Sequence, residues 1–133
     1  MNVALWIVQV LLALFSVAAG WNHGLRPLHD TIQSSPWAAD VPAALVRFIG
    51  FAELAAGVGL VLPAATRILP ILTPLAAAGL AVVMGLAIPF HIMRGESNVA
   101  LHIVVVALCA FVAWGRFRRL PIRARDDGKT ARS

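Results

Sequence analysis

The sequence predicts an all-α fold: a bundle of four transmembrane helices over residues 1–119, with both termini in the cytoplasm. Three observations support this prediction. Of the 133 residues, 60% are hydrophobic and 13% are charged, whereas a soluble domain has roughly 45–50% and about 25%. The chain contains four apolar runs long enough to cross a bilayer. The net charge of +5 lies wholly in the last 18 residues, which hold seven basic and two acidic side chains.

The first apolar run, at about residues 3–21, contains no charged side chain. Its clearly polar side chains are those of Gln9 and Ser16, and Trp21 ends it, where aromatic residues anchor helices at the membrane interface. Small residues around Ala18 are typical of a signal-peptide cleavage site, but no basic residue precedes the apolar region. We therefore expect a retained spanning helix.

The other three runs lie at about residues 42–62, 68–91 and 98–115. Each is long enough to cross roughly 30 Å of hydrocarbon at about 1.5 Å per residue. Pro42 and Pro70 stand in the first turns of two of these runs, where a missing N–H is tolerated. Long runs without alternation are not barrel strands, so we expect helices.

The basic residues near the ends of the spans predict the orientation. An even number of spans places both termini on one side, which receives Arg67 and the basic tail, while the other side receives Arg26 and Arg94. The positive-inside rule then places the termini in the cytoplasm, and we expect a bacterial cytoplasmic membrane. Residues 22–41 become the external loop. Residues 120–133 are expected to be a basic, disordered tail that contacts anionic lipid.

Two ionisable residues lie inside the second run. A charged side chain within a span costs about 2.5–3.5 kcal/mol on insertion scales and usually faces the interior of a bundle. At about 100° per residue, Gly50, Glu53 and Gly57 share one helix face, and the glycines let a neighbouring helix approach closely. Glu53 is therefore expected to point into the bundle, with Arg47 about 9 Å before it along the axis.

Histidines of other spans fall at a similar depth. His91 ends the third run, His102 lies about one turn into the fourth, and His23 follows the first. Pro89 has no N–H for the preceding turn and is expected to kink the third helix just before His91. The predicted polar cluster, in the outer half of the membrane, comprises Arg47, Glu53, His91 and His102, with His23 above.

Three interpretations of this cluster stay open. The first is a buried Arg47–Glu53 pair that fixes helix register, although a buried pair is weak evidence for stability. The second is a pocket that binds a ligand or handles protons. A metal site built on His91, His102 and Glu53 is disfavoured, because no tight ligand spacing such as H-x-x-x-H is present.

Several other function classes are excluded or disfavoured. The single cysteine, Cys109, excludes a dithiol mechanism within one chain. The sequence contains no glycine-rich phosphate loop, nucleophile elbow or nucleotide-binding fingerprint. Because the basic tail directly follows a span, it is interpreted as a topology signal and not as a nucleic-acid-binding segment.

Two motifs resemble a known family. Residues 47–53, R-F-I-G-F-A-E, resemble the R-x-x-G-x-x-E of the second helix in DoxX-like membrane proteins, and residues 90–96, F-H-I-M-R-G-E, resemble the F-H-x-x-R-G-E that ends their third helix. The Gly115-Arg116 exit also matches, and the resemblance covers about residues 5–119. It implies a four-helix membrane protein. The motif positions that carry over are Arg47, Gly50, Glu53 and His91.

The resemblance also implies several functions. Some DoxX-related proteins are membrane subunits linked to thiosulfate:quinone oxidoreduction or to thiol and oxidative-stress systems, and distant relatives act in membrane-protein assembly. The leading hypothesis is a redox-associated subunit that binds a quinone-like or small apolar ligand near Glu53 and His91, with a membrane or soluble redox protein as partner. The alternatives are a non-catalytic assembly partner and a small carrier or channel that works as an oligomer. At most, the chain is the membrane subunit of an oxidoreductase system.

Overall fold

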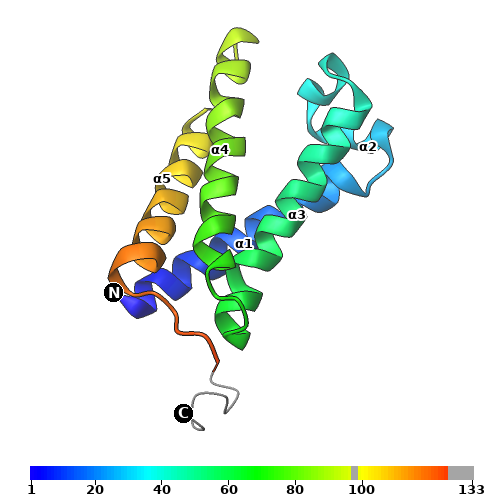
Figure 1. Cartoon of the computed structure of the whole chain (residues 1–133). Helices are drawn as coiled ribbons and strands as arrows, with labels where there is room; N and C mark the ends of the chain where they lie inside the picture. The colour runs from blue at the N-terminus through cyan, green and yellow to red at the C-terminus, as the bar shows by residue number, and fades with distance from the viewer. Residues whose placement is uncertain (97–98, 126–133) are drawn as a thin grey trace, which may run out of the picture.

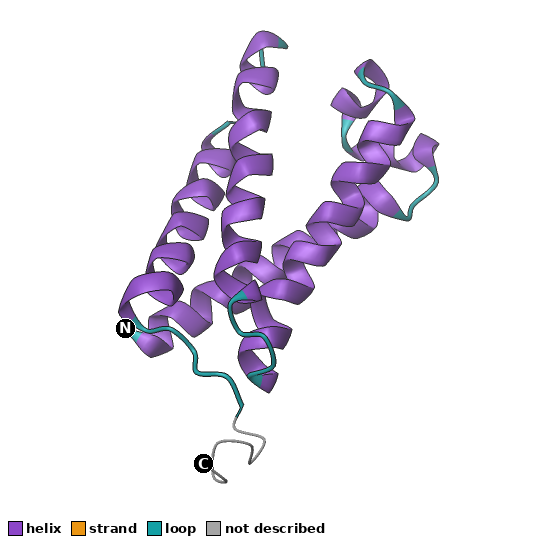
Figure 2. Cartoon of the chain, viewed as in Figure 1, coloured by secondary structure: helices purple, strands orange, loops and turns teal. Residues whose placement is uncertain are grey.

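The computed structural model describes residues 1–96 and 99–125, and every regular element within them is helical (Figure 2). Four helices of 20 to 24 residues are long and apolar enough to cross a membrane. The predicted start of the fourth span at residue 98, and the predicted disorder of the tail beyond residue 125, lie outside the described residues. The long helices are α1 (Asn2–Gly24), α3 (Ala43–Thr66), α4 (Leu72–Met93) and α5 (Ala100–Trp114), which continues into the π-helical turn η2 (Gly115–Arg119).

Two short elements join α1 to α3, namely α2 (Leu28–Ser34) and the 3-10 helix η1 (Pro36–Asp40). α1 lies against α3, α4 lies against α5, and the contact between α3 and α4 joins the two pairs. Figure 1 shows that α3 leans away from α4 toward the end that carries α2. We call this end the loop end, and the end with the N-terminus the terminal end.

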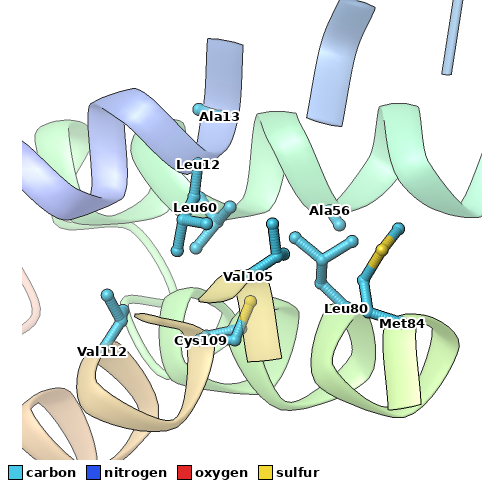
Figure 3. Close-up of a cluster of buried hydrophobic side chains, with 10 residues drawn as sticks. Leu12, Ala13, Ala56, Leu60, Leu80, Met84, Val105, Cys109 and Val112 are labelled. Carbon is cyan, nitrogen blue, oxygen red and sulfur yellow. The ribbon is translucent and has the colours of Figure 1, made fainter. Parts of the chain in front are cut away.

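The hydrophobic core draws side chains from all four long helices (Figure 3). The opposite faces of the helices are also apolar, and their large side chains are exposed, as in Phe48 at 68% and Leu86 at 70%. This distribution is what a bilayer requires, because a membrane helix buries one face in the bundle and turns the others to lipid. The labelled core residues are Leu12 and Ala13 of α1, Ala56 and Leu60 of α3, Leu80 and Met84 of α4, and Val105, Cys109 and Val112 of α5.

Glycines allow α1 and α3 to cross with their backbones in direct contact. A Cβ added to Gly50 would lie 2.1 Å from the backbone nitrogen of Gly24, and one added to Gly20 would lie 2.8 Å from the carbonyl oxygen of Gly50. Further along, a Cβ on Gly57 would lie 2.6 Å from Cγ2 of Val17. The crossing therefore tolerates no side chain at Gly50, and it brings the last turn of α1 against the first half of α3.

The turn between α3 and α4 differs from the prediction. α3 passes through Pro63 and ends at Thr66, not at residue 62. Pro63 has no N–H for the carbonyl of Gly59, but Thr73 Oγ1 donates a hydrogen bond to that carbonyl at 3.0 Å, so the helix continues without an orphaned acceptor. α4 begins at Leu72 and not at residue 68.

The late start of α4 has a local cause. Leu69 precedes Pro70, and the residue before a proline is disfavoured in the right-handed helical region. Leu69 instead has φ 48°, and Arg67 before it has φ 59°. Residues 67–71 are consequently a turn. At the other end of the bundle, α1 extends to Gly24, past its predicted end at residue 21.

Candidate functional site

The loop end contains a buried carboxyl group, that of Glu53, which is 2% exposed. It stands on the face of α3 that also carries Gly50 and Gly57, against α1. An unpaired buried charge is unfavourable, and His23 in the last turn of α1 supplies the partner. Its Nδ1–H donates to Oε2 of Glu53 at 2.7 Å. Nε2 of the same ring lies 3.4 Å from the hydroxyl of Ser35.

Arg47 contacts the same histidine at a different atom. Its Nη1 donates to the backbone carbonyl of His23 at 3.0 Å, which satisfies one of the carbonyl groups left without a partner at the end of a helix. A direct Arg47–Glu53 pair was one of the open interpretations of the cluster, and in the described part of the chain no ion pair joins these two side chains. Because α1 extends to Gly24, it carries His23 between the two side chains, and both attach to that residue.

A second group of polar side chains joins α4 to α5 and to η1. His91, at 7% exposure, donates from Nδ1 to Oε2 of Glu96. Nε of Arg94 donates to the other carboxylate oxygen of Glu96 at 3.2 Å, and the same guanidinium forms an ion pair with Asp40 of η1. The hydrogen bond from His91, aided by Arg94, holds the pKa of Glu96 below its ordinary value of 4.5. The ring of His102 lies 4.6 Å from that of His91.

Trp37 of η1 lies between the two polar groups. Its ring centroid is 5.2 Å from that of His23 and 6.4 Å from that of His91, both in edge-to-face orientation. It also meets Phe90 at 6.3 Å. Its side chain is half-buried among these rings. We define the loop-end site as Glu53, His23, Arg47, Trp37, His91 and His102.

The predicted cluster is thus divided into two parts. Glu53 and Arg47 meet at His23, while His91 and His102 meet each other on the far side of Trp37. Pro89, predicted beside the cluster, is exposed within an uninterrupted α4. Among the described residues, no three His, Cys, Asp or Glu side chains could hold a metal ion.

Sequence reasoning missed the contributions of Trp37, Glu96 and Asp40. A signal existed for Glu96, since it belongs to the F-H-I-M-R-G-E motif and is five residues from His91. No comparable signal existed for Trp37 or Asp40, because their contacts depend on how residues 25–42 fold back over the bundle.

Another buried polar group lies at the terminal end. Arg116 is 3% exposed, and its Nε donates to Oε1 of Gln9 at 2.6 Å. Gln9 in turn donates from Nε2 to the carbonyl of Leu60 at 2.8 Å. In the sequence, the charge of Arg116 counts with those of the last 18 residues, and the structure shows that its side chain is buried against α1. The signal that could have found it is Gln9, a polar side chain in the middle of the first apolar run.

Comparisons with known proteins agree with this architecture. A search of curated proteins and a search of solved structures each found no match. The family model described as the DoxX-like family matches residues 7–113, which carry all of the loop-end site. Taken with four helices able to cross a membrane, this match shows that the chain is a multi-pass integral membrane protein and belongs to the DoxX-like family.

Proposed function

We propose that the chain is the membrane subunit of a redox system, and that its loop-end site binds a quinone-like molecule and exchanges protons on binding. The observation that supports this proposal is the Glu53–His23 pair. This pair joins a carboxyl group inside the bundle to the ring of His23, which is 12% exposed and lies against Ser35, between α2 and η1. Histidine is the side chain that ordinarily changes charge between about pH 5 and 8, so it suits proton exchange at physiological pH.

The side chains present fit a flat molecule with carbonyl oxygens. His23 and His91 place ring nitrogens on either side of Trp37, and the aromatic rings of Trp37 and Phe90 offer apolar surfaces. Reduction of a quinone to a quinol takes up electrons and protons in equal number. In this proposal a partner redox protein supplies the electrons, and this chain binds the molecule and supplies protons.

The hydrogen bond to Glu53 determines how His23 exchanges its proton. An ionised carboxylate only accepts hydrogen bonds, so Nδ1 of His23 carries a proton and the neutral ring has none on Nε2. Nε2 can donate to a ligand carbonyl only after it takes up a proton. The resulting imidazolium is stabilised by the carboxylate of Glu53, while Arg47 holds the backbone of His23 in place. Ligand binding is therefore coupled to proton uptake.

This coupling can be tested by the pH dependence of binding. The full chain in mild detergent is titrated with a short-chain ubiquinone, followed by quenching of tryptophan fluorescence. Binding by the wild type should strengthen as the pH falls, by up to about tenfold per pH unit for one proton taken up. Glu53→Gln should flatten this dependence, because the glutamine amide can donate to Nδ1 and leave a proton on Nε2.

The matched control is His29→Gln, which changes an exposed histidine on α2 whose side chain contacts Gln33. It should bind with the pH dependence of the wild type. Trp37→Phe should remove most of the quenching if the ligand lies at the loop-end site. Absence of ubiquinone binding by the wild type, or equal pH dependence in wild type and Glu53→Gln, would show that the proposal is wrong.

A second candidate function, an assembly partner for another membrane protein, is favoured by one feature of α4. A Cβ added to Gly79 or Gly85 would meet nothing within 4 Å, so a neighbouring helix has room to approach there. If this face holds a partner, Gly79→Leu should lose a co-purifying membrane protein that mass spectrometry identifies with the wild type. Equal recovery with both chains would contradict this function.

We also propose the orientation that the basic residues predict, with both termini in the cytoplasm of a bacterial cell. Cysteine labelling in intact cells tests it, because Cys109 is buried and should stay silent. His29→Cys should react with a membrane-impermeant maleimide from outside, and Arg125→Cys should react only after permeabilisation. The reverse pattern would show the opposite orientation.

A further inference from the structure

At the terminal end, far from the loop-end site, Arg116 is held by a set of neutral partners. Its Nε donates to Gln9, and its Nη1 donates to Oδ1 of Asn2 at 2.9 Å and to the carbonyl of Leu120 at 3.1 Å. The guanidinium carbon also lies 5.6 Å from the ring centroid of Trp6. These contacts fix the guanidinium against the first turns of α1.

The charge of Arg116 has no counterpart in the described residues. None of the ion pairs formed there involves Arg116, and its Nη2 is buried without a hydrogen-bond partner. Burial of a cation without an opposite charge is unfavourable, and so is burial of an unused N–H donor. Both conditions are relieved by an anion that accepts a hydrogen bond from Nη2.

Arg116 lines a cavity of about 350 Å³. One wall is the turn between α3 and α4, and the other is the chain that follows η2. Apart from Arg116, every lining side chain is apolar, so the cavity suits a molecule that has an anionic group next to an apolar part. These lining residues are Leu69, Pro70, Ile71, Pro121, Ile122 and Ala124.

The wall that follows η2 is tied to the rest of the bundle through Arg67. Nε of Arg67 donates to the carbonyl of Arg123 at 2.9 Å, and the backbone N–H of Arg125 donates to the carbonyl of Arg67 at 2.7 Å. These three arginines are exposed, and they lie in the turn and in the chain segment that carry the two walls of the cavity. They give the whole region a positive potential that attracts anions.

We propose that this cavity binds the phosphate group of an anionic lipid, with Arg116 as the residue that contacts the phosphate. A phosphodiester supplies the negative charge and the acceptor oxygens that the guanidinium lacks, and arginine matches phosphate geometry well. The apolar walls accommodate the glycerol and the first acyl carbons, which a free phosphate ion does not have. The predicted cytoplasmic orientation adds to this, because anionic lipids attract basic segments at that surface.

Native mass spectrometry of the full chain, released from mild detergent, tests the proposal. The probes are dioleoyl phosphatidylglycerol, dioleoyl phosphatidylcholine and inorganic phosphate. Arg116→Gln should weaken binding of phosphatidylglycerol about tenfold or more, as expected for loss of a hydrogen bond to a charged group. The matched control is Arg118→Gln, which removes the same charge from an exposed side chain of the same turn and should bind as the wild type does.

A second variant keeps the test decisive if Arg116→Gln does not fold. Ala124→Trp places a large ring in the cavity from an exposed position and leaves every hydrogen bond of Arg116 in place. It should fold and should lose phosphatidylglycerol to a similar extent.

Four results would overturn the proposal. Equal weakening by Arg118→Gln and Arg116→Gln would mean that the lipid is held by diffuse tail charge. Undiminished binding by Ala124→Trp would place the lipid outside the cavity. Phosphatidylcholine bound as tightly as phosphatidylglycerol would mean that the negative charge is not recognised. Inorganic phosphate bound as tightly as the lipid would make the site one for a free anion.

Discussion

Replacing Gly50 with alanine tests whether the crossing of α1 and α3 builds the loop-end site. The new Cβ would lie 2.1 Å from the backbone nitrogen of Gly24 and 2.6 Å from the carbonyl carbon of His23, whereas ordinary contact begins near 3.4 Å. These obstructing atoms belong to the backbone and cannot rotate away. α1 must therefore move from α3 by about 1.3 Å, the difference between 3.4 and 2.1 Å.

This displacement is expected to cost free energy in two ways. Overpacking of a tight interface typically destabilises by about 1–3 kcal/mol. Moving His23 by the same distance stretches its 2.7 Å hydrogen bond to Glu53 to about 4 Å, which is beyond hydrogen-bond range. Loss of a hydrogen bond to a charged group costs about 1.5–3 kcal/mol. We expect Gly50→Ala to lower the free energy of unfolding by about 2.5–6 kcal/mol.

The assay is unfolding of the full chain in mixed micelles by titration with sodium dodecyl sulfate, followed by circular dichroism. The matched control is Gly79→Ala on α4, where the new Cβ meets nothing within 4 Å. Alanine favours a helix by about 0.8–1 kcal/mol over glycine, so this variant should be as stable as the wild type or more stable. If Gly50→Ala and Gly79→Ala unfold at the same detergent fraction, the reasoning from the helix crossing is refuted.

Two other predictions concern single hydrogen bonds. Thr73→Val should lower the free energy of unfolding by about 1–3 kcal/mol because the carbonyl of Gly59 loses its donor. In a chain that also carries Pro63→Ala, Thr73→Val should cost much less, because the alanine restores the helical N–H. An equal loss of stability with and without Pro63→Ala would contradict this. The hydrogen bond from His91 lowers the pKa of Glu96. The ionised carboxylate of Glu96 therefore stabilises the folded chain above about pH 4.5, and this stabilisation is lost as the pH falls through the lowered pKa. The difference in Tm between wild type and Glu96→Gln should therefore shrink in acid, and a difference that stays constant from neutral pH down to about pH 3 would be evidence against this role.

Much of the fold was predictable because bilayer thickness constrains it directly. Four apolar runs of the required length predict four spans, and the structure contains four helices of that kind. The inward position of Glu53 was also predictable, since helical periodicity places it on the same face as Gly50 and Gly57. The boundaries were less accurate, because the second run was predicted to end at residue 62, whereas α3 continues through Pro63 and Thr73, on the next helix, supplies the missing donor.

The arrangement of the site depended on details that periodicity does not contain. His23 reaches Glu53 because α1 extends three residues past its predicted end. Trp37 separates the two histidine groups because η1 folds back over the bundle. The burial of Arg116 arises from contact with Gln9, which is 107 residues away in the chain. Each of these contacts is tertiary, so neither periodicity nor the charge pattern could predict them.

The most direct test of the proposed proton exchange at Glu53 and His23 is a count of the protons taken up when ligand binds. Calorimetric titration of the full chain with a short-chain ubiquinone, in two buffers of different ionisation enthalpy, gives this number. We predict net proton uptake for the wild type and for His29→Gln, and none for Glu53→Gln. The same proton uptake in all three chains, or none in the wild type, would contradict the role assigned to the Glu53–His23 pair.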